Sequence, residues 1–84
     1  MFLLCMESMA VAFYFLKVRG DLDTALEKIK QLNNVEYAVG IFGKYDVIVK
    51  VSGNYPKDMV DFWREASEIG GVRITDKCLS PKLD

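Results

Sequence analysis

Few residues in this 84-residue chain belong to the types that usually carry out catalysis or bind metals. Histidine is absent, and the cysteines Cys5 and Cys78 lie far apart, without a CxxC spacing. Zinc sites and disulfide frameworks need clustered Cys or His residues, and most catalytic sites need a paired acid or base. We therefore expect no metal, no cofactor, no catalytic residue and no enzymatic activity. Cys78 is expected to be a small buried hydrophobic side chain.

Asp46 is the acidic residue whose surroundings best indicate a binding role. It follows Tyr45 and opens a stretch of valine and isoleucine that only Lys50 and Ser52 interrupt. A carboxylate among apolar neighbours must be hydrated, paired or bound to a cation, and the ammonium group of an amino acid is such a cation. From the residues alone, a solvated strand end or an ion pair with Lys44 or Lys50 is the simpler explanation.

The elements that would position Asp46 follow from hydrophobic periodicity. β-branched and aromatic residues predict strands, and apolar residues spaced by three and four predict helices. The second helix is expected to bury Met59, Val60, Trp63, Ala66 and Ile69. The predicted strands cover 10–18, 35–42, 45–52 and 72–79, and the predicted helices cover 21–32 and 56–69.

This order of elements predicts an α+β, ferredoxin-like βαββαβ fold. Such a fold is a four-stranded antiparallel sheet with both helices on one face. The domain is expected to span 10–79, with 1–9 as an N-terminal extension able to add a strand and 80–84 as a polar tail.

The central hairpin predicts that the second face of the sheet is also apolar. A two-residue turn at Gly43-Lys44 would pair Phe42 with Tyr45 and would place Tyr45 on the helix side. Because two helices cover only one face, the other face is expected to stack on a second copy of the chain as a sheet-to-sheet dimer. Its expected interface residues are Val35, Tyr37, Val39, Ile41 and Ile48.

Composition and charge exclude other classes of protein. Apolar residues make up 51% of the chain and charged residues 27%, a balance typical of globular domains. The net charge is −1 and the basic residues are scattered, so we expect no direct binding of nucleic acid. No run of about 18 apolar residues is present, so no membrane span is expected. These features favour a cytoplasmic protein.

The region 10–79 resembles the effector (RAM) domain of the Lrp/AsnC family of transcription regulators. The resemblance rests on Leu16-Lys17-Val18, on Leu32-Asn33-Asn34-Val35, on the block from Gly43 to Val51, and on Gly71-Val72. The Gly-x-Tyr-Asp motif in that block is the most specific of these features. Family members carry a helix-turn-helix ahead of this domain, and this sequence has no room for one. It is therefore similar to the stand-alone RAM type.

The resemblance implies binding and assembly. It implies dimers that associate into rings, as octamers or decamers, and an amino acid or similar small metabolite bound between dimers near the Gly-x-Tyr-Asp turn. Gly43, Tyr45 and Asp46 match that turn, and Thr75 matches the first residue of a Thr-x-Thr pattern that helps to hold the effector. Lys77 replaces the second threonine, where it would bind an anionic group or block the site. Equally, it would be a solvated lysine on an edge strand, with no role in binding. The resemblance also implies co-assembly with full-length Lrp/AsnC regulators.

Two other classes of function are compatible with this topology. Small dimeric α/β-barrel enzymes, some of them monooxygenases, share it, but the lack of histidine and of any paired nucleophile argues against them. A purely structural oligomerisation module is the other alternative. Ligand binding separates the effector-binding module from both.

Overall fold

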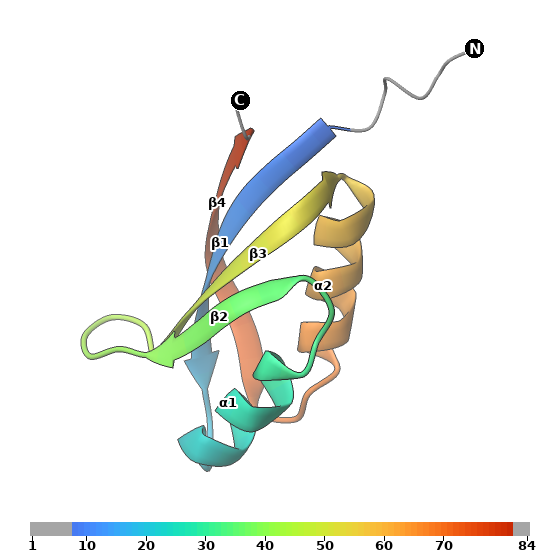
Figure 1. Cartoon of the computed structure of the whole chain (residues 1–84). Coiled ribbons are helices and arrows are strands. Elements are labelled where there is room, and N and C mark those ends of the chain that lie inside the picture. Colours follow the sequence, from blue (N-terminus) through green and yellow to red (C-terminus); the bar gives the residue numbers. More distant parts are fainter. Residues whose placement is uncertain (1–7, 82–84) are drawn as a thin grey trace.

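The computed structural model describes residues 8–81, and these form the predicted ferredoxin-like fold. The strands pair in the order β2-β3-β1-β4, antiparallel throughout. Both helices lie on one face of this sheet and leave the other face open (Figure 1). The elements are β1 (Ser8–Val18), α1 (Leu22–Lys30), β2 (Val35–Gly40), β3 (Val47–Tyr55), α2 (Lys57–Ser67) and β4 (Val72–Pro81).

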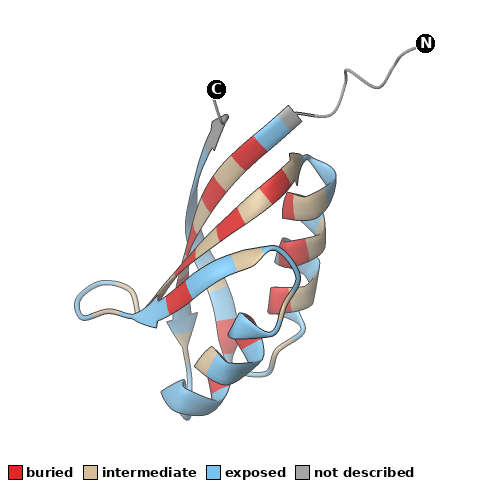
Figure 2. Cartoon of the chain, viewed as in Figure 1, coloured by how far each residue is buried: buried red, intermediate tan, exposed pale blue. Residues whose placement is uncertain are grey.

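The hydrophobic core lies between the sheet and the two helices. Alternate residues of the two central strands point into it, as the period of two in a strand requires (Figure 2). They are Ala10, Ala12, Tyr14 and Leu16 of β1, and Val47, Val49 and Val51 of β3. The helices contribute Ala25, Ile29, Met59, Phe62 and Ala66.

The buried side of α2 differs from the predicted one. Met59 and Ala66 are buried as expected, but Phe62 is buried in place of Val60 and Trp63. Val60 and Trp63 lie on the flank of α2, where they are 56% and 39% exposed. Compared with the predicted orientation, the helix is rotated about its axis so that Phe62 faces the sheet. There its ring packs against the ring of Tyr14, with the centroids 4.7 Å apart.

The predicted hairpin register is confirmed, but the two-residue turn is wrong. Gly40 pairs with Val47, and Ile41 N–H donates to the Asp46 carbonyl over 2.9 Å, so the pairing is the expected one. Regular strand structure nevertheless stops at Gly40 and resumes only at Val47. The residues between them form a loop that projects from the sheet (Figure 1), with Gly43 at a φ of +119°.

Val35 does not lie on the open face, contrary to the prediction. The register of β2 against β3 shifts between Val35 and Tyr37, which places Val35 opposite Val51 and against the core. Such a bulge inserts one residue, and one extra residue moves a side chain to the opposite face.

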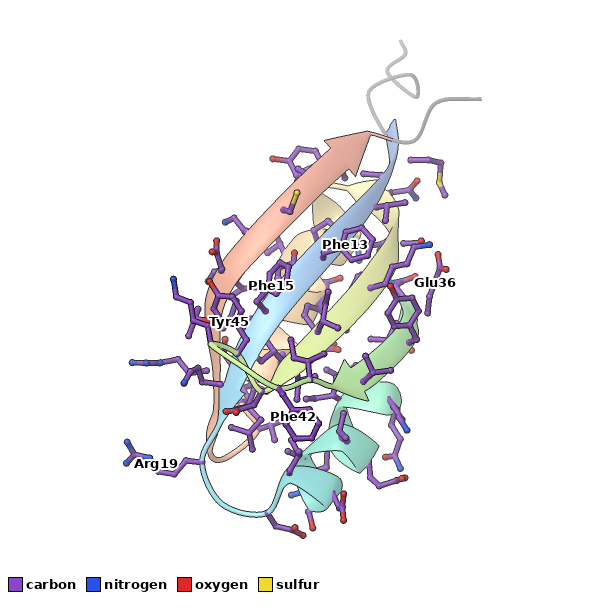
Figure 3. All side chains as sticks on the ribbon, turned by 90° about the vertical axis from the view of Figure 1, so that its left-hand side faces the viewer. Phe13, Phe15, Arg19, Glu36, Phe42 and Tyr45 are labelled. Carbon is purple, nitrogen blue, oxygen red and sulfur yellow. The ribbon has the colours of Figure 1, made fainter. Side chains whose placement is uncertain are left out.

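The outward position beside the bulge is occupied by Glu36 (Figure 3). Its carboxylate accepts a hydrogen bond from Ser52 and forms an ion pair with Lys50 at 3.4 Å. The bulge therefore places a polar cluster at this margin of the open face.

No helix within residues 8–81 has the length and apolar character needed to span a membrane.

Candidate functional site

The open face of the sheet carries several of the predicted interface residues. Phe13 and Phe15 of β1 alternate with the buried residues of that strand and point outward, away from the helices (Figure 3). On β2, Tyr37 and Val39 are 43% and 44% exposed, and Ile48 of β3 lies half-buried beside Val39. Apolar side chains thus extend across three strands of this face.

Cys78 pairs with Phe13 across β1 and β4, and its side chain is exposed. The expectation of a buried cysteine is therefore wrong. Because Cys78 pairs with Phe13, its side chain points to the same face as that of Phe13, which neither helix covers.

Tyr45 also lies on the open face, although the sequence pattern placed it on the helix side. Its ring packs against Phe15 with centroids 5.1 Å apart, and its hydroxyl donates a hydrogen bond to Asp76 Oδ2 over 3.0 Å. Figure 3 shows the two aromatic side chains next to each other. The alternation rule fails here because Tyr45 belongs to the loop and not to a strand.

Asp46 connects the hairpin to the end of β1. Its backbone N–H donates to the Leu16 carbonyl and its Oδ2 accepts the Val18 N–H, each over 2.9 Å. The carboxylate therefore replaces a backbone acceptor at the point where the sheet ladder ends. No hydrogen bond from the described residues reaches the other oxygen, Oδ1, which leaves it available to a cationic group.

Thr75 lies at an irregularity in β4. The register of β1 against β4 shifts between Phe15 and Leu16, which leaves Thr75 without a strand partner. Its hydroxyl donates to the Phe15 carbonyl over 3.0 Å. The next residue, Asp76, accepts the Tyr45 hydroxyl, so Thr75, Asp76 and Tyr45 all meet at Phe15.

We use the name hairpin site for the group Phe15, Tyr45, Asp46, Thr75 and Asp76. Two of its members are acidic, and lysines lie beside it: Lys44 Nζ is 5.6 Å from the Tyr45 ring centroid, and Lys17 Nζ donates to the Lys44 carbonyl. Separate negative and positive groups of this kind can hold the ammonium and the carboxylate of a zwitterion. Gly43, in the loop, has no side chain to obstruct the approach, and no heavy atom of the protein lies within 4 Å of the position that a Cβ would take there.

Lys77 is not part of the hairpin site. It pairs with the buried Tyr14, on the helix side of the sheet, and its Nζ lies 4.6 Å from the ring centroid of Trp63 on α2. The sheet therefore separates Lys77 from Tyr45 and Asp76. The role that the sequence suggested for Lys77 beside the turn does not agree with this placement.

Two members of the hairpin site were missed in the sequence analysis. Asp76 is the single acidic residue of the last predicted strand, and its position between Thr75 and Lys77 was the available signal. Phe15 gave no separate signal because it stands in a run of aromatic and aliphatic residues. Only the folded chain brings Phe15 and Asp76 to Tyr45.

Among residues 8–81, no three His, Cys, Asp or Glu side chains lie close enough together to hold a metal ion.

Comparisons with known proteins place this fold. No protein-family model and no curated protein matches the sequence. The solved structures similar to it include the following three. Hypothetical protein PHS023 from Pyrococcus horikoshii is 25% identical with a TM-score of 0.67, over 88% of this chain and 89% of that one. E. coli AsnC is 19% identical with a TM-score of 0.70, and FFRP-DM1 is 23% identical with a TM-score of 0.62.

The lengths covered differ among these structures. The match with AsnC covers 89% of this chain and 51% of the AsnC chain. The match with FFRP-DM1 covers 89% of this chain and 99% of the FFRP-DM1 chain. This chain thus corresponds to about half of AsnC and to nearly all of FFRP-DM1. It has the fold of an Lrp/AsnC-like RAM domain, as its sequence indicated.

Proposed function

We propose that this protein is an effector-binding and oligomerisation module of the Lrp/AsnC type. Its effector is an amino acid or a similar small zwitterion, bound at the hairpin site between associated dimers. The observation that carries the proposal is that one hairpin loop holds Tyr45 on Asp76 and the next residue, Asp46, on the Val18 N–H, beside an open apolar sheet face. The RAM-like fold supports the same conclusion.

The residue roles follow from the local chemistry. Asp46 accepts the effector ammonium through its remaining oxygen, because a charge-assisted hydrogen bond is about twice as strong as a neutral one. Tyr45 and Phe15 form an aromatic wall, and Thr75 supplies a hydroxyl close to it. Gly43 lets a second subunit approach the loop. Lys77 has no role in this site, because it lies on the other face of the sheet.

The open face is the surface proposed for the dimer. Tyr37, Val39, Ile41 and Ile48 would meet their equivalents in a second copy, and Val35 is excluded because it packs against the core. An apolar face of this kind is costly to leave in water. We expect such dimers to associate further into a ring and to be able to incorporate full-length Lrp/AsnC regulators.

A thermal-shift screen against the twenty amino acids tests the proposal. An effector present at about 100 times its Kd adds about 2.7 kcal/mol to the folded state, which corresponds to a rise of about 10–20 °C in Tm for a domain of this size. Asp46→Asn should abolish the shift, since it removes the charge at nearly constant shape. Asp23→Asn makes the same chemical change at an exposed position in α1 and should retain it. If no amino acid raises the Tm, or if the Asp46→Asn variant responds like the wild type, the proposal that an effector binds at this site is wrong.

A further inference from the structure

A concave surface lies on the opposite side of the sheet from the hairpin site. It opens between α2 and the paired ends of β1 and β4, which lie at the top of the molecule in Figure 1. Its volume is about 370 Å³, within the range of small-molecule sites. The apolar part of its wall includes Ala12, Tyr14, Met59, Val60, Trp63 and Leu79. We call it the α2 cleft.

The wall of the α2 cleft exposes large apolar side chains on a concave surface. Val60 is 56% exposed, Leu79 43% and Trp63 39%. These residues surround a single hollow and are not scattered over the surface, which is the pattern of a binding site. The buried Tyr14 forms the floor, with its hydroxyl directed to the Met59 carbonyl at 3.4 Å. Burial raises the pKa of Tyr14, so the floor stays uncharged at neutral pH.

Two cations stand at the rim of the cleft, and they differ in their partners. Arg64 already pairs with Asp61 at 3.3 Å. Lys77 forms no ion pair with any of the described residues, and its Nζ is held over the Trp63 ring at 4.6 Å. None of the residues that line the cleft is acidic. The cleft therefore combines an apolar wall with one positioned ammonium group that has no counter-charge.

We propose that the α2 cleft binds a small monocarboxylic acid with an aromatic or branched apolar body. Lys77 pairs with its carboxylate, and the body packs among Val60, Trp63 and Leu79. A neutral apolar molecule would leave the Lys77 charge unmatched, and a zwitterion would place its ammonium group beside Lys77 and Arg64. This site is separate from the hairpin site, because the sheet lies between them.

Trp63 provides a direct readout, since it is the only tryptophan in the chain. Titration of the full-length protein with 3-phenylpropanoate should shift the Trp63 emission saturably. The matched neutral probe, 3-phenylpropanamide, should bind at least about tenfold more weakly, because it cannot form the charge-assisted pair. Equal binding of the two probes, or no response to either up to about 10 mM, a concentration that still detects millimolar affinity, would overturn the proposal.

Variants locate the binding. Lys77→Met keeps most of the stem, removes the charge and should cancel the preference for the acid, whereas Lys30→Met, at an exposed position on α1, should keep it. Val60→Glu would supply Lys77 with a carboxylate from within the protein and should prevent the acid from binding. Asp46→Asn should bind the acid like the wild type, which separates this site from the hairpin site.

Two results would show a different origin for the signal. If Lys77→Met retained the acid-over-amide ratio, Lys77 would not be the recognition group. If Trp63 emission changed with protein concentration in the absence of any probe, a second copy of the chain would occupy the cleft. Either result contradicts a small-molecule site.

Discussion

The hydroxyl of Tyr45, in the hairpin loop, donates a hydrogen bond to the carboxylate of Asp76 on β4, 31 positions later in the sequence. This contact crosses the end of β1, where the Tyr45 ring also packs on Phe15. The hydrogen bond thus connects the loop between β2 and β3 to β4, which lies on the other side of β1 in the sheet. The same two residues close one side of the hairpin site.

Tyr45→Phe and Tyr45→Ala separate the two parts of this contact. Tyr45→Phe keeps the ring on Phe15 and should reduce the free energy of unfolding by less than about 1 kcal/mol, since the lost hydrogen bond is exposed to water. Tyr45→Ala loses the ring contact as well and should cost more, by about 0.5–1.5 kcal/mol. Urea unfolding measures both. Equal losses would show that the ring contact contributes nothing.

Asp46 is expected to have a structural role that can be measured apart from binding. Asp46→Ala removes the acceptor for the Val18 N–H and should lower the free energy of unfolding by about 1–3 kcal/mol. Asp46→Asn keeps a carbonyl oxygen in that place and should cost clearly less. Both variants should fail to bind the effector in calorimetry. An alanine variant as stable as the asparagine variant would contradict this role for the carboxylate.

Assembly is expected to depend on the open face of the sheet. Val39→Asp places a charge at an exposed position of that face and should convert the dimer to monomer without unfolding it. Val60→Asp makes the same change on α2, away from the open face, and should leave the dimer intact. Light scattering after gel filtration distinguishes the two. A monomeric wild-type protein, or a dimeric Val39→Asp variant, would argue against a sheet-to-sheet dimer.

Gly71 and Gly70 should tolerate alanine very differently. Gly71 has a φ of +83°, and a Cβ there would collide with the Arg19 carbonyl oxygen. The two residues are held together because the backbone N–H of Arg19 donates to the Gly71 carbonyl over 2.7 Å. Gly71→Ala should therefore destabilise the protein by more than about 1 kcal/mol. Gly70 has open space around it, and Gly70→Ala should change stability by less than that. Thermal unfolding of the two variants compares adjacent positions directly.

A pair on α2 predicts a specific pH dependence. The hydrogen bond from Lys57 holds the pKa of Asp61 below its ordinary value, and Asp61 raises the pKa of Lys57. The contribution of Asp61 to stability is thus present above about pH 4 and is lost as the pH falls through its depressed pKa. The contribution of Lys57 is present below about pH 10 and is lost at higher pH. In Lys57→Met, the Asp61 pKa measured by NMR should return toward that of a free aspartate, and an unchanged pKa would contradict the pairing.

Much of the fold follows from local sequence patterns. The alternation in 45–52 identified the buried face of β3, and the apolar spacing in 21–32 and 56–69 identified both helices, because these periods are properties of single elements. The hairpin register was also predictable. A hairpin centred on Gly43-Lys44 brings Ala38 opposite Val49 and Gly40 opposite Val47, as observed. For the hairpin site, the Gly-x-Tyr-Asp motif indicated the right loop and two of the five members of the site.

The sequence by itself determined the order of the elements and which face of the sheet the helices cover. The tertiary structure decided the face on which individual side chains near the irregular positions lie. Val35 moved to the core because of a bulge, Tyr45 reached the open face from a loop, and Lys77 lies across the sheet from Tyr45. The physical reason is the period of two: one extra or unpaired residue reverses the face of a side chain, and only the pairing of neighbouring strands determines where that residue is inserted.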